Sequence, residues 1–422
     1  MRRVMTGVLV FLAACGSGDF TQEELALLRE LTLATVPPSP TNEYADNVKA
    51  AELGQMFFFD SRFSGPLKVT SDLGAAGEPG KVACVSCHDP ANGGTDHRSQ
   101  PGNTSLGADF TGRNSPSVYN VAYYSWMFWD GRKDSVWSQA LGPVESGVEH
   151  NFSRLGVAHV IYDHYRARYE EVFGAKWPMP LLSDTVRFPL AGKPGEPAFD
   201  NMAAADQDAV NRVFANFGKA IEAYERKLIH RNTAFDKYLE GDEMALSPAA
   251  KRGAKVFVGK AACMECHDGG EGGNFADGEF HNTGVSQTGA NLPNNDPGRT
   301  AGITTVLNDM FNAKGVYSDA PTDVLLAGLA PTAVHEGAFK TPGLRGVSKT
   351  APYMHSGSIK SLKDVMVFYK EGGDPGGFSG TKDEAMKPLL LTDREIDDLV
   401  AFMESLDGEP LPDALVNKPA LP

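Results

Sequence analysis

The pattern Cys-x-x-Cys-His occurs twice in this chain of 422 residues, at Cys84, Cys87 and His88 and again at Cys263, Cys266 and His267. The chain has five cysteines, and the fifth, Cys15, lies in the N-terminal segment. Exported proteins usually join paired cysteines in disulfides, but here no pair is left outside the two motifs. The chain must therefore fold around two sites of the same chemistry, one in each half.

Three kinds of site use closely spaced cysteines. A four-cysteine zinc site would require the two motifs to meet and would leave His88 and His267 unexplained. A redox dithiol uses Cys-x-x-Cys but does not require a histidine in the next position. The full pattern is the attachment motif of c-type haem, in which the sulfurs bond the haem vinyl groups and the histidine binds the iron. We therefore predict two covalent haem c groups, with His88 and His267 as proximal ligands.

The N-terminal segment has the features of an export signal. Arg2 and Arg3 precede a short apolar run, Val4 to Ala14, which is too short to span a membrane. The run ends in "LAAC", which matches a bacterial lipobox and predicts that Cys15 is acylated; the alternative is an ordinary signal peptide with a chance cysteine. We predict a periplasmic protein that a lipid anchors to the membrane.

The charge of the chain restricts its partners. The formal net charge is −15, which argues against a nucleic-acid partner because the phosphate backbone is also negative. A small substrate, or a neutral or basic protein partner, is compatible with this charge.

Helical patterns dominate the rest of the sequence. Residues 20–31 and 208–229 carry apolar side chains at helical spacing, Ser247 and Pro248 begin another helix, and Thr392 with Glu395 forms a capping box. Strand-like alternation is rare, and residues 89–120 form a loop-rich stretch. We predict a mainly α fold with two cytochrome-c-like haem domains, long loops and little strand. The predicted divisions are a signal peptide (1–14), a tether and leading helix (15–45), an N-terminal peroxidatic haem domain (46–241), a C-terminal electron-transfer haem domain (242–412) and a tail (413–422).

Two stretches resemble the bacterial dihaem cytochrome c peroxidase and MauG family. They are "RNSPSVYNVAYYSWMFWDGRKDSVWSQALGPVESGVEH" and "FKTPGLRGVSKTAPYMHSGSIKSLKDVMVFYKEGG". The resemblance extends from about Leu53 to Leu406, and its motifs follow the family's order around both haems. It implies an enzyme that uses hydrogen peroxide at the first haem.

The resemblance assigns roles to four residues near the first haem. A tryptophan in "FWDGR" relays electrons between the haems in the family, and here it is Trp129. The pocket glutamine and the distal glutamate correspond to Gln139 and Glu149, with Pro143 between them. A glutamate suits this place because breaking a peroxide bond requires a group that moves a proton between its two oxygens.

The resemblance also implies a calcium ion between the haem domains. Its ligands correspond to Asn114 and the backbone carbonyls of Thr350 and Pro352, which are oxygen donors of the kind that calcium accepts.

The axial ligands differ from those of many peroxidases in the family. Those proteins carry a blocking histidine in a "S-[IL]-G-H" setting, where this chain has "SLGA" with Ala108. We expect a five-coordinate first haem, with His97 as the alternative ligand. The second haem's methionine corresponds to Tyr369, as in MauG, and Met354 and Met366 are the nearby alternatives.

Together these features imply a MauG-like enzyme, most similar to the MbnH-type branch. Members of that branch oxidise a tryptophan of a copper-binding partner after peroxide brings the two haems to a high-valent state. We expect an exported protein substrate that is oxidised at a tryptophan or tyrosine. MauG's surface tryptophan before the second motif is Ala261 here, so the electron exit route must differ. The alternatives are a plain cytochrome c peroxidase fed by a small cytochrome or copper protein, and a non-enzymatic electron conduit.

Overall fold

The computed structural model describes residues 18–422, so Cys15 and the predicted signal peptide lie outside the described residues. The described chain is mainly helical and contains a single sheet of two short antiparallel strands, in which Phe280 is opposite Lys340. The prediction of a mainly α fold with long loops and little strand is confirmed. The longer elements are α1 (Gln22–Glu30), α2 (Val48–Phe59), α3 (Val136–Glu145), α4 (Arg154–Val160), α5 (Arg166–Phe173), α6 (Pro197–Asp200), α7 (Ala204–Glu225), α8 (Ala234–Leu239), α9 (Pro248–Val258), β1 (Phe280–His281), α10 (Arg299–Asn308), β2 (Phe339–Lys340), α11 (Leu362–Glu371), α12 (Asp393–Glu404) and α13 (Asp413–Val416).

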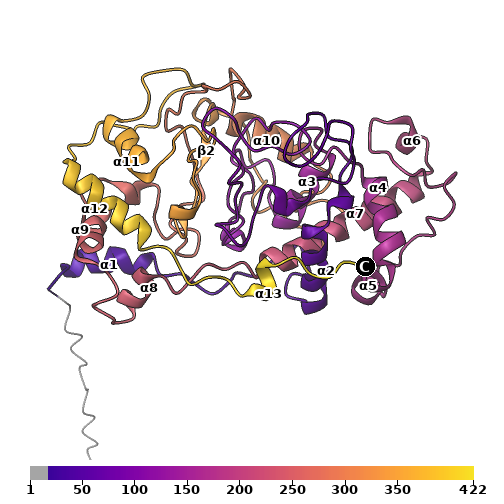
Figure 1. Cartoon of the computed structure of the whole chain (residues 1–422), viewed down its shortest axis with the longest axis horizontal. Helices are drawn as coiled ribbons and strands as arrows, with labels where there is room; N and C mark the ends of the chain where they lie inside the picture. The colour runs from indigo at the N-terminus through magenta and orange to yellow at the C-terminus, as the bar shows by residue number, and fades with distance from the viewer. Residues whose placement is uncertain (1–17) are drawn as a thin grey trace, which may run out of the picture.

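Two hydrophobic cores lie at opposite ends of the elongated molecule (Figure 1). The first core is built on α7, against which α2 and α3 pack. The second core is built on α9 and α12, which pack face to face, with α1 and α11 beside them. Each core therefore supports one of the two Cys-x-x-Cys-His motifs.

Three helices of the second core begin directly after a side chain that caps their N-terminus. Thr21, Ser247 and Thr392 each accept a hydrogen bond from a backbone N–H in the first turn of α1, α9 and α12. These caps satisfy N–H groups that have no partner within the helix. The predicted helix starts at Ser247–Pro248 and at Thr392 are confirmed.

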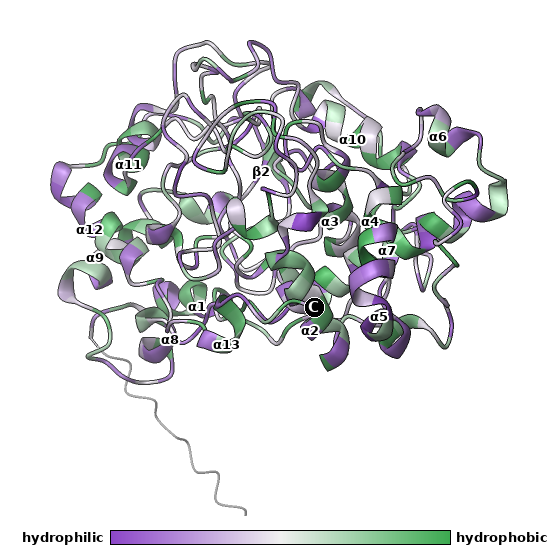
Figure 2. Cartoon of the chain, turned by 45° about the vertical axis from the view of Figure 1, so that its right-hand side comes forward, coloured by the Kyte–Doolittle hydropathy of each residue, from purple (hydrophilic) through white to green (hydrophobic). Residues whose placement is uncertain are grey.

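Amphipathic helices cover both cores. The helix α12, for example, buries Ile396, Leu399, Phe402 and Met403 and exposes charged residues between them. Figure 2 shows the same mixture of hydrophilic and hydrophobic residues along α5 and α12. Within residues 18–422, no helix is both long enough and apolar enough to cross a membrane.

The chain crosses between the two cores several times, whereas the predicted domain ranges imply a single crossing near residue 242. The leading helix α1 packs on α9, and Phe235 and Tyr238 of α8 also belong to the second core although they precede residue 242. In the other direction, Phe311 and Tyr317 pack in the first core, and so does Leu415 of the tail. These exchanges fasten the two halves to each other.

Candidate active site

The two cysteine–histidine motifs adopt the same local backbone. Each first cysteine begins a short 3-10 turn, η2 (Cys84–Ser86) and η5 (Cys263–Glu265). The His88 N–H donates to the Cys84 carbonyl at 3.0 Å, and the His267 N–H donates to the Cys263 carbonyl at 2.8 Å. The four thiols of the motifs are half-buried and form no disulfide. Two sulfurs and one imidazole are thus gathered on a single turn, as attachment of haem requires.

The histidine rings have a nitrogen available for iron. His267 donates from Nδ1 to the Phe275 carbonyl at 2.8 Å, which fixes the ring and leaves Nε2 as the metal-binding atom. The His88 ring lines a cavity, and its Nδ1 is buried without a hydrogen-bond partner. Both motifs therefore fit a proximal ligand of a covalently attached haem.

The cavity beside His88 has a volume of about 530 Å³ and extends toward the second half of the chain. Its walls include Trp129, Gln139 and Glu149, which the sequence placed together, and also Lys340 of β2. A volume of this size is typical of sites that enclose a cofactor-sized ligand.

Glu149 is one of the acidic residues that line the cavity, and Gln139 lines the same cavity. Burial raises the pKa of its carboxyl, and the charge of Arg132 and a hydrogen bond from Ser146 oppose that effect. The Glu149 carbonyl accepts from the Ala108 N–H at 2.7 Å. A carboxyl with a raised pKa exchanges its proton closer to neutral pH, which suits acid–base chemistry.

Pro143 is placed differently from the other three residues, because it does not line the cavity. It lies inside α3, and its carbonyl accepts from the His150 N–H at 3.0 Å. His150 in turn hydrogen bonds to the Phe63 carbonyl at 2.9 Å. The Pro143 carbonyl therefore anchors the residue that follows Glu149 in the chain.

Trp129 lies where the two halves meet. Its Nε1 donates to the Asn114 carbonyl at 2.8 Å, and its own carbonyl accepts from the Lys340 N–H at 2.7 Å. The resemblance places one of these partners, Asn114, between the two haem domains, and the other, Lys340, lies on β2 in the second half of the chain. The indole N–H and the backbone of Trp129 are thereby both anchored in the wall of the cavity.

The alternative axial ligand of the first haem lies outside the cavity. His97 is exposed and hydrogen bonds to the Asn92 carbonyl at 2.5 Å. Ala108 is fully buried, and its backbone packs against Glu149 and Lys68. No histidine other than His88 lines the cavity of the described chain.

Tyr369 lies beside the second motif. The helix α11, capped by Ser361 and ended by Gly372 with φ +77°, carries this side chain against the second core. Burial raises the pKa of the Tyr369 phenol, and the nearby sulfurs of Cys266 and Cys263 add to the effect. Met366 is one helical turn earlier and packs on the same core, whereas Met354 also lines the first cavity.

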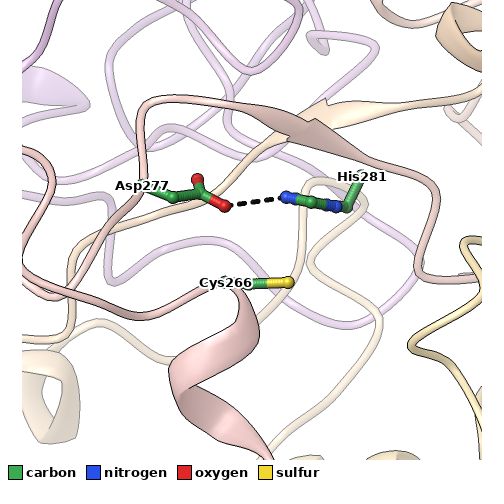
Figure 3. Close-up of side chains that lie close together, drawn as sticks. All are labelled: Cys266, Asp277 and His281. Atoms are coloured by element: carbon green, nitrogen blue, oxygen red, sulfur yellow. Dashed lines mark hydrogen bonds and ion pairs between the residues drawn. The ribbon is translucent and has the colours of Figure 1, made fainter.

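A histidine and two carboxylates surround the second attachment site. Donor atoms of Cys266, Asp277 and His281 lie within 4.8 Å of one another (Figure 3). His281 hydrogen bonds to Asp277 at 2.8 Å and to Asp383 at 2.7 Å. The bond to Asp277 raises the pKa of His281 to about 11, helped by Cys266. Both ring nitrogens of His281 are engaged by carboxylates, so neither is free to bind a metal ion.

The three predicted calcium ligands are close together. The Asn114 Nδ2 donates to the Pro352 carbonyl at 2.8 Å, and all three residues line the cavity. The Asn114 Oδ1 is buried and has no hydrogen-bond partner. Neutral oxygens of this kind fit a hard cation such as calcium.

A buried acid, Glu149, and the histidine of a Cys-x-x-Cys-His motif, His88, line the same cavity, and a haem peroxidase requires both kinds of group. The family model described as di-haem cytochrome c peroxidase matches residues 48–244. The chain is 32% identical over 408 residues to the cytochrome-c peroxidase IdrP1 of Pseudomonas sp. (strain SCT), covering 92% of this chain and 89% of that protein. It is 30% identical over 413 residues to the methylamine utilization protein MauG of Methylorubrum extorquens, covering 97% and 92%.

Solved structures agree with this similarity. A crystal structure of a MauG-like protein associated with microbial copper homeostasis has a TM-score of 0.59 and 25% identity, covering 92% of this chain and 98% of that one. The chain belongs to the dihaem cytochrome c peroxidase and MauG family and is a peroxide-dependent oxidoreductase.

Two basic residues near the motifs, Lys340 and Arg98, belong to no motif in the sequence. Lys340 lies in the segment "FKTP". A lysine inside a short strand was the one feature that could have indicated a buried cation. The Nη2 of Arg98 donates to the Ser86 and Leu106 carbonyls, both at 2.7 Å, and lies 3.6 Å from the Cys87 sulfur. An arginine in a polar loop gives no sequence signal for such a role.

Removing one attachment motif should halve the haem content. We expect about two haems per chain in a reducing pyridine assay of the denatured protein, because only covalently bound haem survives denaturation. The double variant Cys263→Ala/Cys266→Ala should retain one haem. Zinc in place of haem would contradict the assignment of both motifs.

Proposed function

We propose that the protein uses hydrogen peroxide to oxidise a tryptophan or tyrosine of an exported partner protein. The observation that carries this proposal is Tyr369, a buried phenol beside Cys263 and Cys266. An anionic oxygen ligand stabilises ferric iron and higher oxidation states more than a thioether does. That ligand suits an enzyme that stores oxidising equivalents for a protein substrate.

The roles follow the geometry of the cavity. The haems, held by the two motifs with His88 and His267 as ligands, supply the redox chemistry when bound. Glu149 moves a proton between the two oxygens of a peroxide in the cavity, and the Gln139 amide orients the peroxide. Trp129, fixed by two backbone hydrogen bonds, connects the halves.

A plain cytochrome c peroxidase is the second candidate. It is favoured by the name of the IdrP1 relative and by Met366, which lies one turn from Tyr369 against the same core. In that case a small cytochrome or copper protein would deliver electrons to the second haem.

The partner and the location are part of the same proposal. The structural relative is associated with copper homeostasis, which supports a copper-binding protein as the exported substrate. We place the enzyme in the periplasm, with a lipid on Cys15, and we assign a calcium ion to Asn114, Thr350 and Pro352.

The first haem should react with peroxide without prior reduction. Ala108 supplies no blocking side chain and His97 lies outside the cavity, so a position on the iron stays open. We expect a high-spin signal in the electron paramagnetic resonance spectrum of the fully oxidised protein. The optical spectrum of the first haem should change when this protein is mixed directly with peroxide. Two low-spin haems that respond only after half-reduction would contradict the open site.

A further inference from the structure

Four cationic side chains line the cavity beside His88: Arg113, Arg132, Lys340 and Arg345. Each arginine is paired with a carboxylate of the protein. Arg113 contacts Asp130 and Asp296 at 2.6 Å, Arg132 contacts Asp130 at 3.0 Å, and Arg345 contacts Asp236 at 2.9 Å. Lys340 has no carboxylate oxygen within 4.0 Å among residues 18–422.

The surroundings of Lys340 compensate its charge only in part. The side chain is 8% exposed, and its Nζ has one hydrogen-bond acceptor, the Thr341 carbonyl at 3.4 Å. The ammonium lies 3.3 Å from the centroid of the Tyr124 ring. Burial lowers the pKa of Lys340 to about 8. A buried charge without a partner is costly, so the cavity's occupant is the expected source of an anion.

The position of Lys340 is fixed by the same backbone that fixes the relay tryptophan. Lys340 belongs to β2, where it is opposite Phe280, and its N–H donates to the Trp129 carbonyl. The strand therefore presents the ammonium to the cavity at a defined point next to Trp129.

We propose that Lys340 binds a propionate carboxylate of the haem that His88 ligates. Haem carries two propionates that are ionised at neutral pH, and a carboxylate paired with a buried ammonium forms a strong, charge-assisted hydrogen bond. Because the arginines are already paired, Lys340 is the cavity cation left for this role. The inference rests on the proposed haem at the first motif.

Glu271 is the alternative partner of Lys340. The charges of Glu271 and Asp277 act on Lys340 from beyond ion-pair distance, Glu271 more strongly. The Glu271 Oε1 accepts from the Ser125 N–H at 2.8 Å. Burial raises the pKa of Glu271, which weakens it as a permanent counter-ion. The variant Glu271→Gln separates the two partners, because it removes the carboxylate and leaves the haem's anion in place.

The test compares Lys340→Met, Lys340→Arg and the unchanged protein, each with its full haem content. A cation near a haem favours the reduced form, so its removal should lower the reduction equilibrium constant of the first haem about tenfold, or about 59 mV for one electron. The propionate bending band of that haem should shift in the resonance Raman spectrum of Lys340→Met. Lys340→Arg keeps the charge and should restore most of both signals.

Lys219→Met is the matched control, since Lys219 is also buried but lies outside the cavity and is paired with Asp319 at 2.7 Å. It should lower stability and leave the first haem's potential and the Raman band unchanged. An unshifted band in Lys340→Met, a shift confined to the second haem, or a Glu271→Gln variant that reproduces the Lys340→Met signals would overturn the inference. Absence of haem from the unchanged protein would instead refute the proposed function.

Discussion

Replacing Tyr369 by phenylalanine should abolish oxidation of the partner protein while both haems stay attached. The ring keeps its packing on the second core, because phenylalanine lacks only the hydroxyl, and attachment depends on Cys263 and Cys266. On the proposed ligation by Tyr369, the substitution removes an anionic ligand of the iron, and axial ligands set haem potentials over a range of about 0.8 V. Loss of the anionic ligand should therefore raise the reduction potential of the second haem strongly.

Two measurements check this expectation. The optical spectrum of the oxidised variant should change at the second haem, and mass spectrometry should find no peroxide-dependent oxidation of an exported copper-binding candidate partner. Peroxide consumption at the first haem, with a reduced small cytochrome as donor, should persist because the cavity around Glu149 is untouched.

Met366→Leu and Met354→Leu are the controls, because each removes a sulfur and nearly conserves volume. Neither should alter the second haem's spectrum if Tyr369 is the ligand. If Tyr369→Phe leaves that spectrum unchanged and one of the methionine variants alters it, that methionine is the ligand. The plain peroxidase would then replace the protein-oxidising enzyme as the better proposal.

The parts of this fold that the sequence predicts are local. The helix start at Thr392 follows from a capping residue and an acid three positions later, and the structure shows both hydrogen bonds. The predicted helix over 208–229 is α7, which ends at Glu225. Its spacing predicts an apolar face, but the buried Lys219 on that helix depends on Asp319, and no local pattern predicts such a distant partner.

The site residues likewise divide into those that the sequence predicts and those that only the folded structure shows. The family resemblance grouped Trp129, Gln139 and Glu149, which lie in one continuous stretch of the sequence, and all three line one cavity. Lys340 reaches that cavity from β2, which is far from this stretch in the sequence. Its importance comes from what is missing around it, a carboxylate partner, and absence of a partner is a property of the folded molecule only.

Glu149→Gln should slow the reaction with peroxide by about 10²–10⁴-fold, the usual loss when a positioned acid–base group is removed. Glutamine has the same shape and can still hydrogen bond, but it cannot carry a proton between the two peroxide oxygens. Stopped-flow mixing of the oxidised protein with peroxide measures this rate, and the haem spectra before mixing should match those of the unchanged protein.

Glu225→Gln is the matched control, because Glu225 lines the same cavity and burial raises its pKa to about 8. Glutamine resembles the neutral acid that Glu225 forms at pH 7, so the rate should stay within a few fold. The two carboxyls also differ in the pH profile. A base works only when ionised, so the raised pKa of Glu149 should move the acidic limb of the rate profile above its usual place near pH 4.5. That limb should vanish in Glu149→Gln and survive in Glu225→Gln. A Glu149→Gln variant with the normal rate and the normal limb would remove Glu149 from the reaction and leave proton transfer to another group or to water in the cavity.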